Sequence, residues 1–192
     1  MFLRTQRLLL RPAWPEDMPA LTAAIAHESV ARMLARVPWP YTEADARTFV
    51  ARDQDPYLPS LLITLPGAGG MIVGGVGLHE DNGEASVGYW VTPELWGCGI
   101  ATEALRGLVG LAKLCGHRRL VAFHAIDNPA SGRVLRNAGF RPTGRMQRRP
   151  SLGRGSDVAG PELALDLADR DDTASIAQPA TASRLMEVPA AA

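Results

Sequence analysis

Residues 87–101 read Val-Gly-Tyr-Trp-Val-Thr-Pro-Glu-Leu-Trp-Gly-Cys-Gly-Ile-Ala, and this stretch decides the fold. Its first five residues predict a buried strand, which ends before Pro93 because proline lacks an amide donor. After the two glycines, apolar residues recur through Cys115 at the spacing of one helix face. The order strand, glycine loop, helix leaves backbone N–H groups at the positive end of a helix, where they bind phosphate. We therefore predict a pyrophosphate-binding loop from Trp96 to Ala101.

Two other kinds of glycine loop do not fit this stretch. A dinucleotide-binding fold needs Gly-x-Gly-x-x-Gly near the first strand, and here Thr102 takes the third glycine position. A nucleoside-triphosphate P-loop needs Gly-Lys-Ser/Thr, which the loop lacks. What remains is a glycine loop between an antiparallel meander and a βαβ unit.

The segments on either side of the loop supply that meander and that unit. Upstream, strands are predicted at 7–12, 61–65 and 71–78, and helices open at Pro15 and Thr42. The third strand of the meander follows the Asn82-Gly83 turn and runs into the opening stretch. Downstream, residues 120–125 predict a buried strand, Asn128-Pro129 opens a helix that ends at Gly139, and strands follow from Phe140 and over 162–167.

Composition excludes several classes of protein. The 192 residues contain 46% hydrophobic residues without an apolar run near twenty, so no membrane-spanning segment is expected. Lys+Arg and Asp+Glu both total 20, which argues against a nucleic-acid partner. No Cys/His cluster has metal-ligand spacing, and no metal is expected. The amino terminus lacks the apolar stretch of a signal peptide, so we expect a cytoplasmic protein.

Two regions remain open at this stage. Residues 1–167 are expected to form one domain, and the Ala/Pro-rich residues 168–192 are expected to be a disordered tail. The late arginines are either a solvated hairpin or a patch that faces an anionic ligand; they are Arg141, Arg145, Arg148, Arg149 and Arg154. Cys98 and Cys115 are too far apart for a disulfide if one continuous helix separates them.

Three motifs resemble the GNAT superfamily of N-acetyltransferases. Residues 96–101 match its acyl-CoA motif Gln/Arg-x-x-Gly-x-Gly/Ala, with tryptophan in the first place. Residues 5–12 with Glu16-Asp17, and residues 128–140, are similar to its first strand and helix and to its second cofactor motif. The Gly-Tyr-Trp-Val unit and the loop after it resemble the branch of the ribosomal-protein N-terminal acetyltransferases of the RimJ and RimL type. The resemblance covers roughly residues 5–167.

The resemblance implies the fold and the reaction. The fold is an α/β domain with a central twisted mixed sheet of about six or seven strands, about four flanking helices and a splayed central strand pair. The reaction moves acetyl from acetyl-CoA to a primary amine, either a protein N-terminus or a small molecule, by direct attack on the thioester. A monomer or homodimer is expected. The alternative is a non-catalytic acyl-CoA-binding or regulatory module, because Ser86 stands where the branch often carries glutamate.

The same resemblance assigns provisional roles to residues. The pyrophosphate would lie on the backbone of the loop and of the first helical turn, which comprises Trp96, Gly97, Cys98, Gly99, Ile100, Ala101 and Thr102. The pantetheine arm would pair with the backbone of Tyr89 and Val91 and bond Asn128, although Asn128 is also explained as a helix cap.

The catalytic groups are less well defined. Ser131 would protonate the departing thiolate, and an ordinary serine in a first helical turn is its other interpretation. Glu84 or Glu80 would be the base, with His79 as a further choice, and each of these is otherwise a solvated hairpin residue. Cys98 replaces an arginine or lysine that is common in the branch, and its thiol is not expected to act as a nucleophile.

Overall fold

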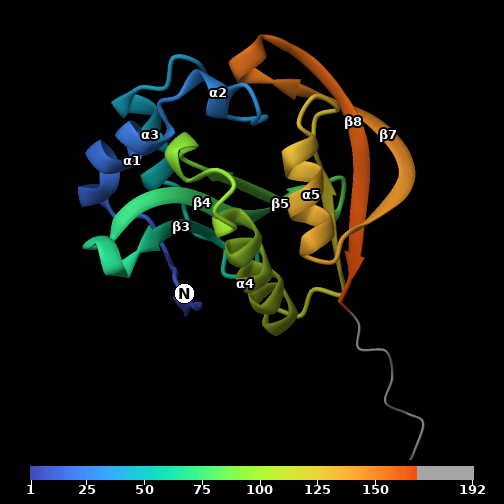
Figure 1. The fold of residues 1–192 in the computed structure, drawn as a ribbon, viewed down its shortest axis with the longest axis horizontal. Helices are drawn as coiled ribbons and strands as arrows, with labels where there is room; N and C mark the ends of the chain where they lie inside the picture. Colours follow the sequence, from blue (N-terminus) through green and yellow to red (C-terminus); the bar gives the residue numbers. More distant parts are fainter. Residues whose placement is uncertain (168–192) are drawn as a thin grey trace, which may run out of the picture.

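The computed structural model describes residues 1–167. They form one sheet with helices on both faces, and its strands follow the order β1-β2-β3-β4-β5-β6-β8-β7 (Figure 1). Every neighbouring pair is antiparallel except β5 and β6, which are parallel. The strands are β1 (Leu3–Arg4), β2 (Leu9–Arg11), β3 (Ser60–Leu65), β4 (Met71–Asp81), β5 (Glu84–Val91), β6 (Arg119–Phe123), β7 (Arg141–Ser151) and β8 (Ser156–Asp166). This mixed sheet between helices confirms the predicted fold class.

The meander β3-β4-β5 brings the glycine loop to the centre of the sheet. Asn82 and Gly83 join β4 to β5 with φ of 52° and 81°, the positive values that a tight hairpin turn requires. The register pairs Gly75 with Trp90. A side chain at Gly75 would lie 2.6 Å from the indole nitrogen of Trp90, so this glycine makes room for the indole.

The two faces of the sheet carry different helices, because neighbouring residues of a strand point to opposite faces. On one face, α1 and α3 pack against Leu62 of β3 and Ile72 of β4. On the other face, α4 packs against Leu61 and Ile63 of β3 and the apolar side of β5, and Leu135 of α5 joins this main core. The helices are α1 (Met18–Ile25), α2 (Glu28–Ala31), α3 (Glu43–Val50), α4 (Ile100–Leu114) and α5 (Pro129–Asn137).

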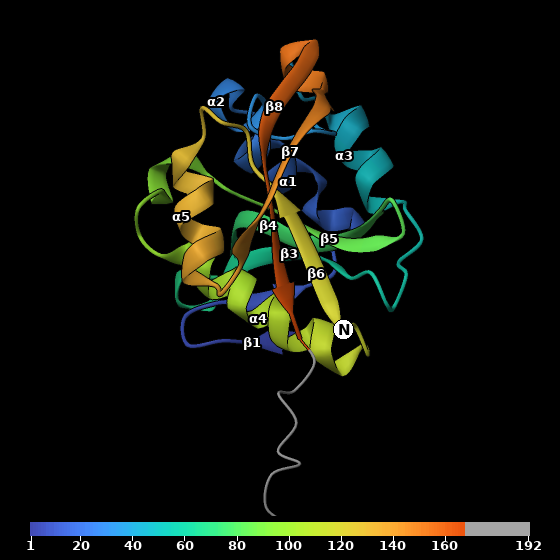
Figure 2. The ribbon, with the colours of Figure 1, turned by 90° about the vertical axis from the view of Figure 1, so that its right-hand side faces the viewer.

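β5 and β6 separate at the centre of the sheet. Their pairing is recorded at one position, Ser86 with Val121, and β6 pairs on its other side with β8 (Figure 2). Toward Val91 the edge of β5 is therefore not covered by β6. The predicted splayed strand pair is present.

The long β7-β8 hairpin reaches back over the amino-terminal helices. At its tip the Leu152 N–H donates to the Ala35 carbonyl, and the Ser151 hydroxyl donates to the Leu34 carbonyl. A side chain at Gly153 would lie 2.5 Å from the Ala31 carbonyl oxygen, so the tip is in close contact with the end of α2 (Figure 1). The hairpin thus connects the β7-β8 end of the sheet to α2 and the residues that follow it.

Several boundaries differ from the sequence-based expectation. The two-residue β1 and the four-residue α2 were not predicted, because neither is long enough to show a hydrophobic period. The last two strands are also longer than predicted, since β7 runs through the arginine-rich stretch and β8 starts at Ser156. The predicted disordered tail at 168–192 lies outside the described residues. No helix within 1–167 is long and apolar enough to cross a membrane.

Candidate active site

The loop between β5 and α4 has the geometry of an anion-binding site. Gly97 and Gly99 both have φ of 78°, a conformation that costs little only for glycine. The first hydrogen bond of α4 runs from the Glu103 N–H to the Gly99 carbonyl. The N–H groups of residues 100–102 therefore have no partner inside the helix and point outward from its positive end.

A cation from the amino terminus adjoins this loop. The Arg7 guanidinium donates to the Cys98 carbonyl at 3.0 Å and to the Glu103 carboxylate at 2.7 Å. Thr5 donates to the same carboxylate at 2.6 Å. Burial raises the pKa of Glu103, but the hydrogen bonds from Thr5 and Arg7 outweigh it and hold this pKa below its usual value. Arg7 thus places a guanidinium beside the loop, and Glu103 balances its charge.

Sequence reasoning missed Arg7 as a member of the site. The contact between Arg7 and Glu103 spans 96 positions of the chain, so no local pattern contains it. The one sequence feature that could have indicated Arg7 was its position within residues 5–12, the stretch that resembles the first strand of the family. A hollow of about 640 Å³ opens beside this pair; it is lined by Thr5, Gln6, Arg7, Gly99, Thr102, Glu103, Arg106, Gly107 and Asn137.

The backbone of β5 presents polar groups to the gap beside β6. The Thr92 N–H bonds the Val73 carbonyl across β4, so by strand alternation the peptide groups of Val91 and Tyr89 face the other way. The Val91 carbonyl accepts from the Trp96 indole at 2.7 Å, which ties the loop to the strand end. The backbone of Tyr89 is directed into the gap, and the pairing of Tyr89 and Val91 with an added chain stays a prediction.

Two hydroxyl groups meet at the edge of this gap. The Tyr89 hydroxyl lies 2.7 Å from Ser131 Oγ and donates to the Ser131 carbonyl at 3.1 Å. Asn128 caps α5, because its Oδ1 accepts from the Ser131 N–H at 3.1 Å. Burial raises the pKa of Tyr89 to about 12, and the hydrogen bond with Ser131 opposes that shift. Tyr89 therefore keeps its proton at neutral pH, and it is a side-chain partner of Ser131 that the sequence did not indicate.

The two predicted carboxylate bases lie near the hairpin turn. Glu84 accepts from Arg119 at 3.1 Å, and Glu80 accepts from the Gly83 N–H at 2.6 Å. Glu84 is five positions before Tyr89 on β5, or about 17 Å along the strand. The structure thus brings Ser131 and Tyr89 together but leaves both glutamates at the other end of the strand. Their role as base stays a prediction.

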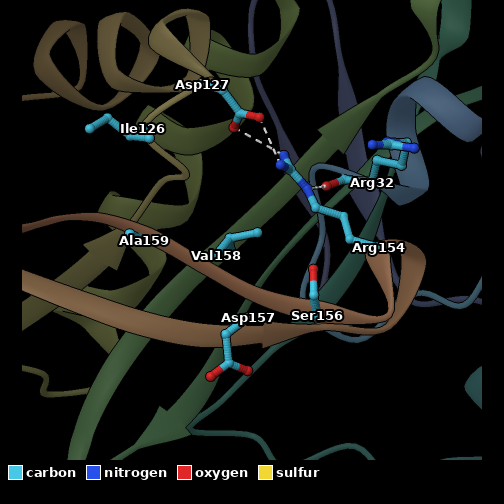
Figure 3. Close-up of a pocket in the computed structure, with 8 residues that line it drawn as sticks. All are labelled: Arg32, Ile126, Asp127, Arg154, Ser156, Asp157, Val158 and Ala159. Carbon is cyan, nitrogen blue, oxygen red and sulfur yellow. Dashed lines mark hydrogen bonds and ion pairs between the residues drawn. The ribbon is translucent and has the colours of Figure 1, made fainter.

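The late arginines divide between exposed and partly buried positions. Arg149 pairs with Asp81 of β4 and lies over the Phe123 ring at 5.0 Å. Arg154 forms a bidentate pair with Asp127 at 2.7 and 3.0 Å, beside a hollow of about 300 Å³ (Figure 3). Arg141, Arg145 and Arg148 are exposed. The stretch is therefore neither a wholly solvated hairpin nor a single continuous patch.

Known proteins match both the sequence and the fold. The family model of the acetyltransferase (GNAT) domain matches residues 7–141. The chain belongs to the GNAT acetyltransferase family. It is an N-acetyltransferase.

Individual relatives agree with this membership. The uncharacterized N-acetyltransferase YoaA of Bacillus subtilis is 29% identical over 153 residues, which cover 76% of this chain and 85% of the relative. A GNAT acetyltransferase of Bacillus anthracis has a TM-score of 0.74 at 23% identity, over 86% of this chain and 98% of that chain. RimL, a ribosomal L7/L12 alpha-N-protein acetyltransferase solved with coenzyme A, has a TM-score of 0.73 at 24% identity, over the same two shares. These two structures support the GNAT fold.

Proposed function

We propose that this GNAT acetyltransferase transfers acetyl from acetyl-CoA to a primary amine by direct attack of the amine on the thioester. One observation carries the proposal: the loop with its unpaired N–H groups adjoins the gap between β5 and β6, and the paired hydroxyls of Tyr89 and Ser131 lie at the edge of that gap. A phosphate site, a strand edge and a proton donor then follow one another. They match the pyrophosphate, the pantetheine arm and the thioester of acetyl-CoA in that order.

The residues present fit a CoA pyrophosphate. The backbone of residues 98–102 would hold it at the helix terminus, where two negative charges are favoured. A side chain at Gly99 would enter this space and would lie 3.4 Å from the Arg7 guanidinium. Arg7, Glu103 and Arg106 line the adjoining hollow, and because Glu103 pairs with Arg7, Arg106 is the arginine there whose charge that carboxylate does not offset.

Toward the thioester, the side chains supply positioning and a proton. The Tyr89 backbone would pair with the pantetheine arm as a neighbouring strand does. Asn128 uses its Oδ1 as the helix cap, and its amide nitrogen would remain for the same arm. Ser131, in hydrogen-bond contact with Tyr89, would give the proton to the departing thiolate.

A thiol-release assay with an amine panel tests the proposal. The purified chain is mixed with acetyl-CoA and either small amines or peptides with free N-termini, and free CoA is measured. Release of CoA that depends on adding an acceptor, with at least one of the two acceptor classes, supports the transferase. Tight CoA binding by calorimetry without release on any acceptor would favour the non-catalytic module. The acceptor class that turns over separates the protein N-terminus from the small amine.

The compartment and the oligomeric state stay expectations: a cytoplasmic protein, and a monomer or homodimer. Fractionation and light scattering measure these directly.

A further inference from the structure

His79 lies on the face of the sheet opposite Tyr89 and Ser131, next to the point where β5 and β6 separate. It pairs across β4 and β5 with Ser86, and Ser86 is the residue of β5 that pairs with β6. Cross-strand partners share one face, so the His79 and Ser86 side chains point the same way. The Tyr89 side chain points to the other face, where it meets α5.

The imidazole of His79 leans along the strand toward the gap. A side chain placed at Gly88 would lie 3.9 Å from both Nδ1 and Cε1 of His79. Gly88 directly precedes Tyr89, whose backbone faces the gap. Because Gly88 has no side chain, no side-chain atom of that residue separates the imidazole from the backbone of β5 beside the gap.

Two polar groups at this point have no partner within residues 1–167. Ser86 is 1% exposed, and its Oγ is the buried side-chain atom of the described region that makes no hydrogen bond. Neither ring nitrogen of His79 forms a hydrogen bond with any residue in 1–167. Buried polar atoms are usually satisfied, so the unpaired Ser86 hydroxyl indicates a place that a polar ligand or water completes, and the half-buried His79 imidazole lies on the same face of the sheet.

The charges around His79 favour its neutral form. Burial lowers the pKa of His79, and the positive charges of Arg36 and Arg149 lower it further. Asp81 and Glu80 of β4 act in the opposite direction without reversing the shift. Arg149 is itself paired with Asp81, which reduces the influence of both charges. A neutral imidazole accepts a proton, as a general base must.

We propose that His79 is the general base that removes a proton from the acceptor amine, with Ser86 as its neighbour in the acceptor site. This proposal depends on the proposed acetyl transfer. The acceptor would approach from the face of α1 and α3, and the thiol would leave on the face of α5. Acid and base then flank the gap from opposite sides of the sheet.

The proton and electron balance of the step is simple. An ammonium acceptor brings three N–H protons. His79 takes one, and the nitrogen lone pair forms the new N–C bond while the C–S bond breaks and its electrons go to sulfur. The Ser131 hydroxyl gives its proton to sulfur. The second proton from nitrogen then replaces the proton that Ser131 has lost. The third stays in the amide, and His79 returns its proton to solvent.

The test is the pH profile of His79→Gln, measured with an acceptor found in the panel. kcat is measured at saturating acetyl-CoA and acceptor, so that titration of the free amine does not enter. The wild-type kcat should fall as pH drops below the ordinary histidine pKa. His79→Gln should lower kcat by about 10²-fold or more and remove this acid limb. Its CoA dissociation constant and melting temperature should stay within error of wild type.

Control variants separate a base from a structural histidine. His117→Gln alters a histidine that lies beyond α4 and contacts the Tyr57 carbonyl, and it should keep both rate and profile. Added imidazole should restore part of the rate of His79→Ala. This second variant still tests the role of His79 if His79→Gln is poorly folded. A kcat within threefold of wild type, or a lower kcat with the acid limb unchanged, overturns the role of His79 and leaves acetyl transfer standing. A wild-type chain that binds CoA but acetylates no amine overturns both proposals together.

Discussion

Gly99 is the residue at which the loop tolerates least change. Its φ of 78° and its place directly before α4 mean that a valine would meet backbone strain of about 1–2 kcal/mol and would project toward Arg7. Gly99→Val should therefore weaken CoA binding by at least about tenfold, or ~1.4 kcal/mol. Isothermal calorimetry measures the change. Gly110→Val is the matched control, since that position of α4 has no neighbour within 4 Å. Equal affinity in the two variants would remove the loop from the CoA site.

Tyr89 and Ser131 should behave as one unit in catalysis. If they pass a proton between them, Tyr89→Phe and Ser131→Ala should each lower kcat by about 10²-fold, while the CoA dissociation constant changes little. The double variant should cost scarcely more than either single one, because the unit is already broken. Stopped-assay kinetics on the three proteins measure this coupling, with Tyr57→Phe as an exposed control. Fully additive losses would show that the two hydroxyls act separately, and an unchanged rate in Ser131→Ala would exclude the serine.

These two sites differ in how far the sequence could predict them. The glycines of the loop, the cap at Asn128 and the serine one turn later are local patterns, and the structure has the cap bond that the pattern implies. Tyr89 with Ser131 and Arg7 with Glu103 are contacts over 42 and 96 positions, which only the folded chain creates. The base was ambiguous for the same reason, since the surroundings of His79 come from β5, β7 and the segment before α3.

At the scale of elements, the hairpin tip depends on close packing against α2. Gly153 has the Ala31 carbonyl carbon 2.7 Å from the place where a side chain would begin. Gly153→Val should push the tip away from α2 and lower the free energy of unfolding by about 1–3 kcal/mol. Thermal unfolding measures the loss, and hydrogen exchange should show faster exchange of the Leu152 N–H, which bonds Ala35. Gly67→Val has open space around it and should leave both unchanged. Slow exchange at Leu152 in Gly153→Val would show that the tip does not depend on this contact.

Helices and strands were predicted where the hydrophobic pattern extends over many residues, and they were missed where the element is short. The fifteen residues of α4 and the eleven of β4 carry clear hydrophobic patterns between turn residues. β1 has two residues, and α2 has four, so each is defined by its neighbours rather than by its own sequence. β7 escaped full prediction because a strand exposed along most of its length has no apolar side to recognise.

At the scale of the whole molecule, the sheet is complete before the predicted tail begins. β8 ends at Asp166, and the Leu167 N–H bonds the Arg118 carbonyl at 2.7 Å. Deleting the residues after Asp169 should therefore leave the melting temperature and the CoA affinity unchanged, because no described strand or helix is shortened. Differential scanning calorimetry of the truncated chain provides the measurement. A loss of several degrees would show that the deleted residues contribute to the fold.

The single recorded pairing of β5 with β6 makes the centre of the sheet the place where a ligand should stabilise most. A bound chain in the gap would supply the partner that the Tyr89 backbone lacks and would connect the two halves of the sheet. At CoA concentrations about 100 times the dissociation constant, linkage predicts about 2.7 kcal/mol of added stability. For a domain of this size, that corresponds to a melting temperature raised by about 5–10 °C. Scanning fluorimetry gives the shift, and hydrogen exchange should show new protection at residues 89–91 and 100–102. At the same CoA concentration, Gly99→Val, which binds at least about tenfold more weakly, should show no more than about half of the added stability, whereas Gly110→Val should show the full shift and the full protection. Protection confined to the helix terminus would mean that the gap is not where the pantetheine arm lies.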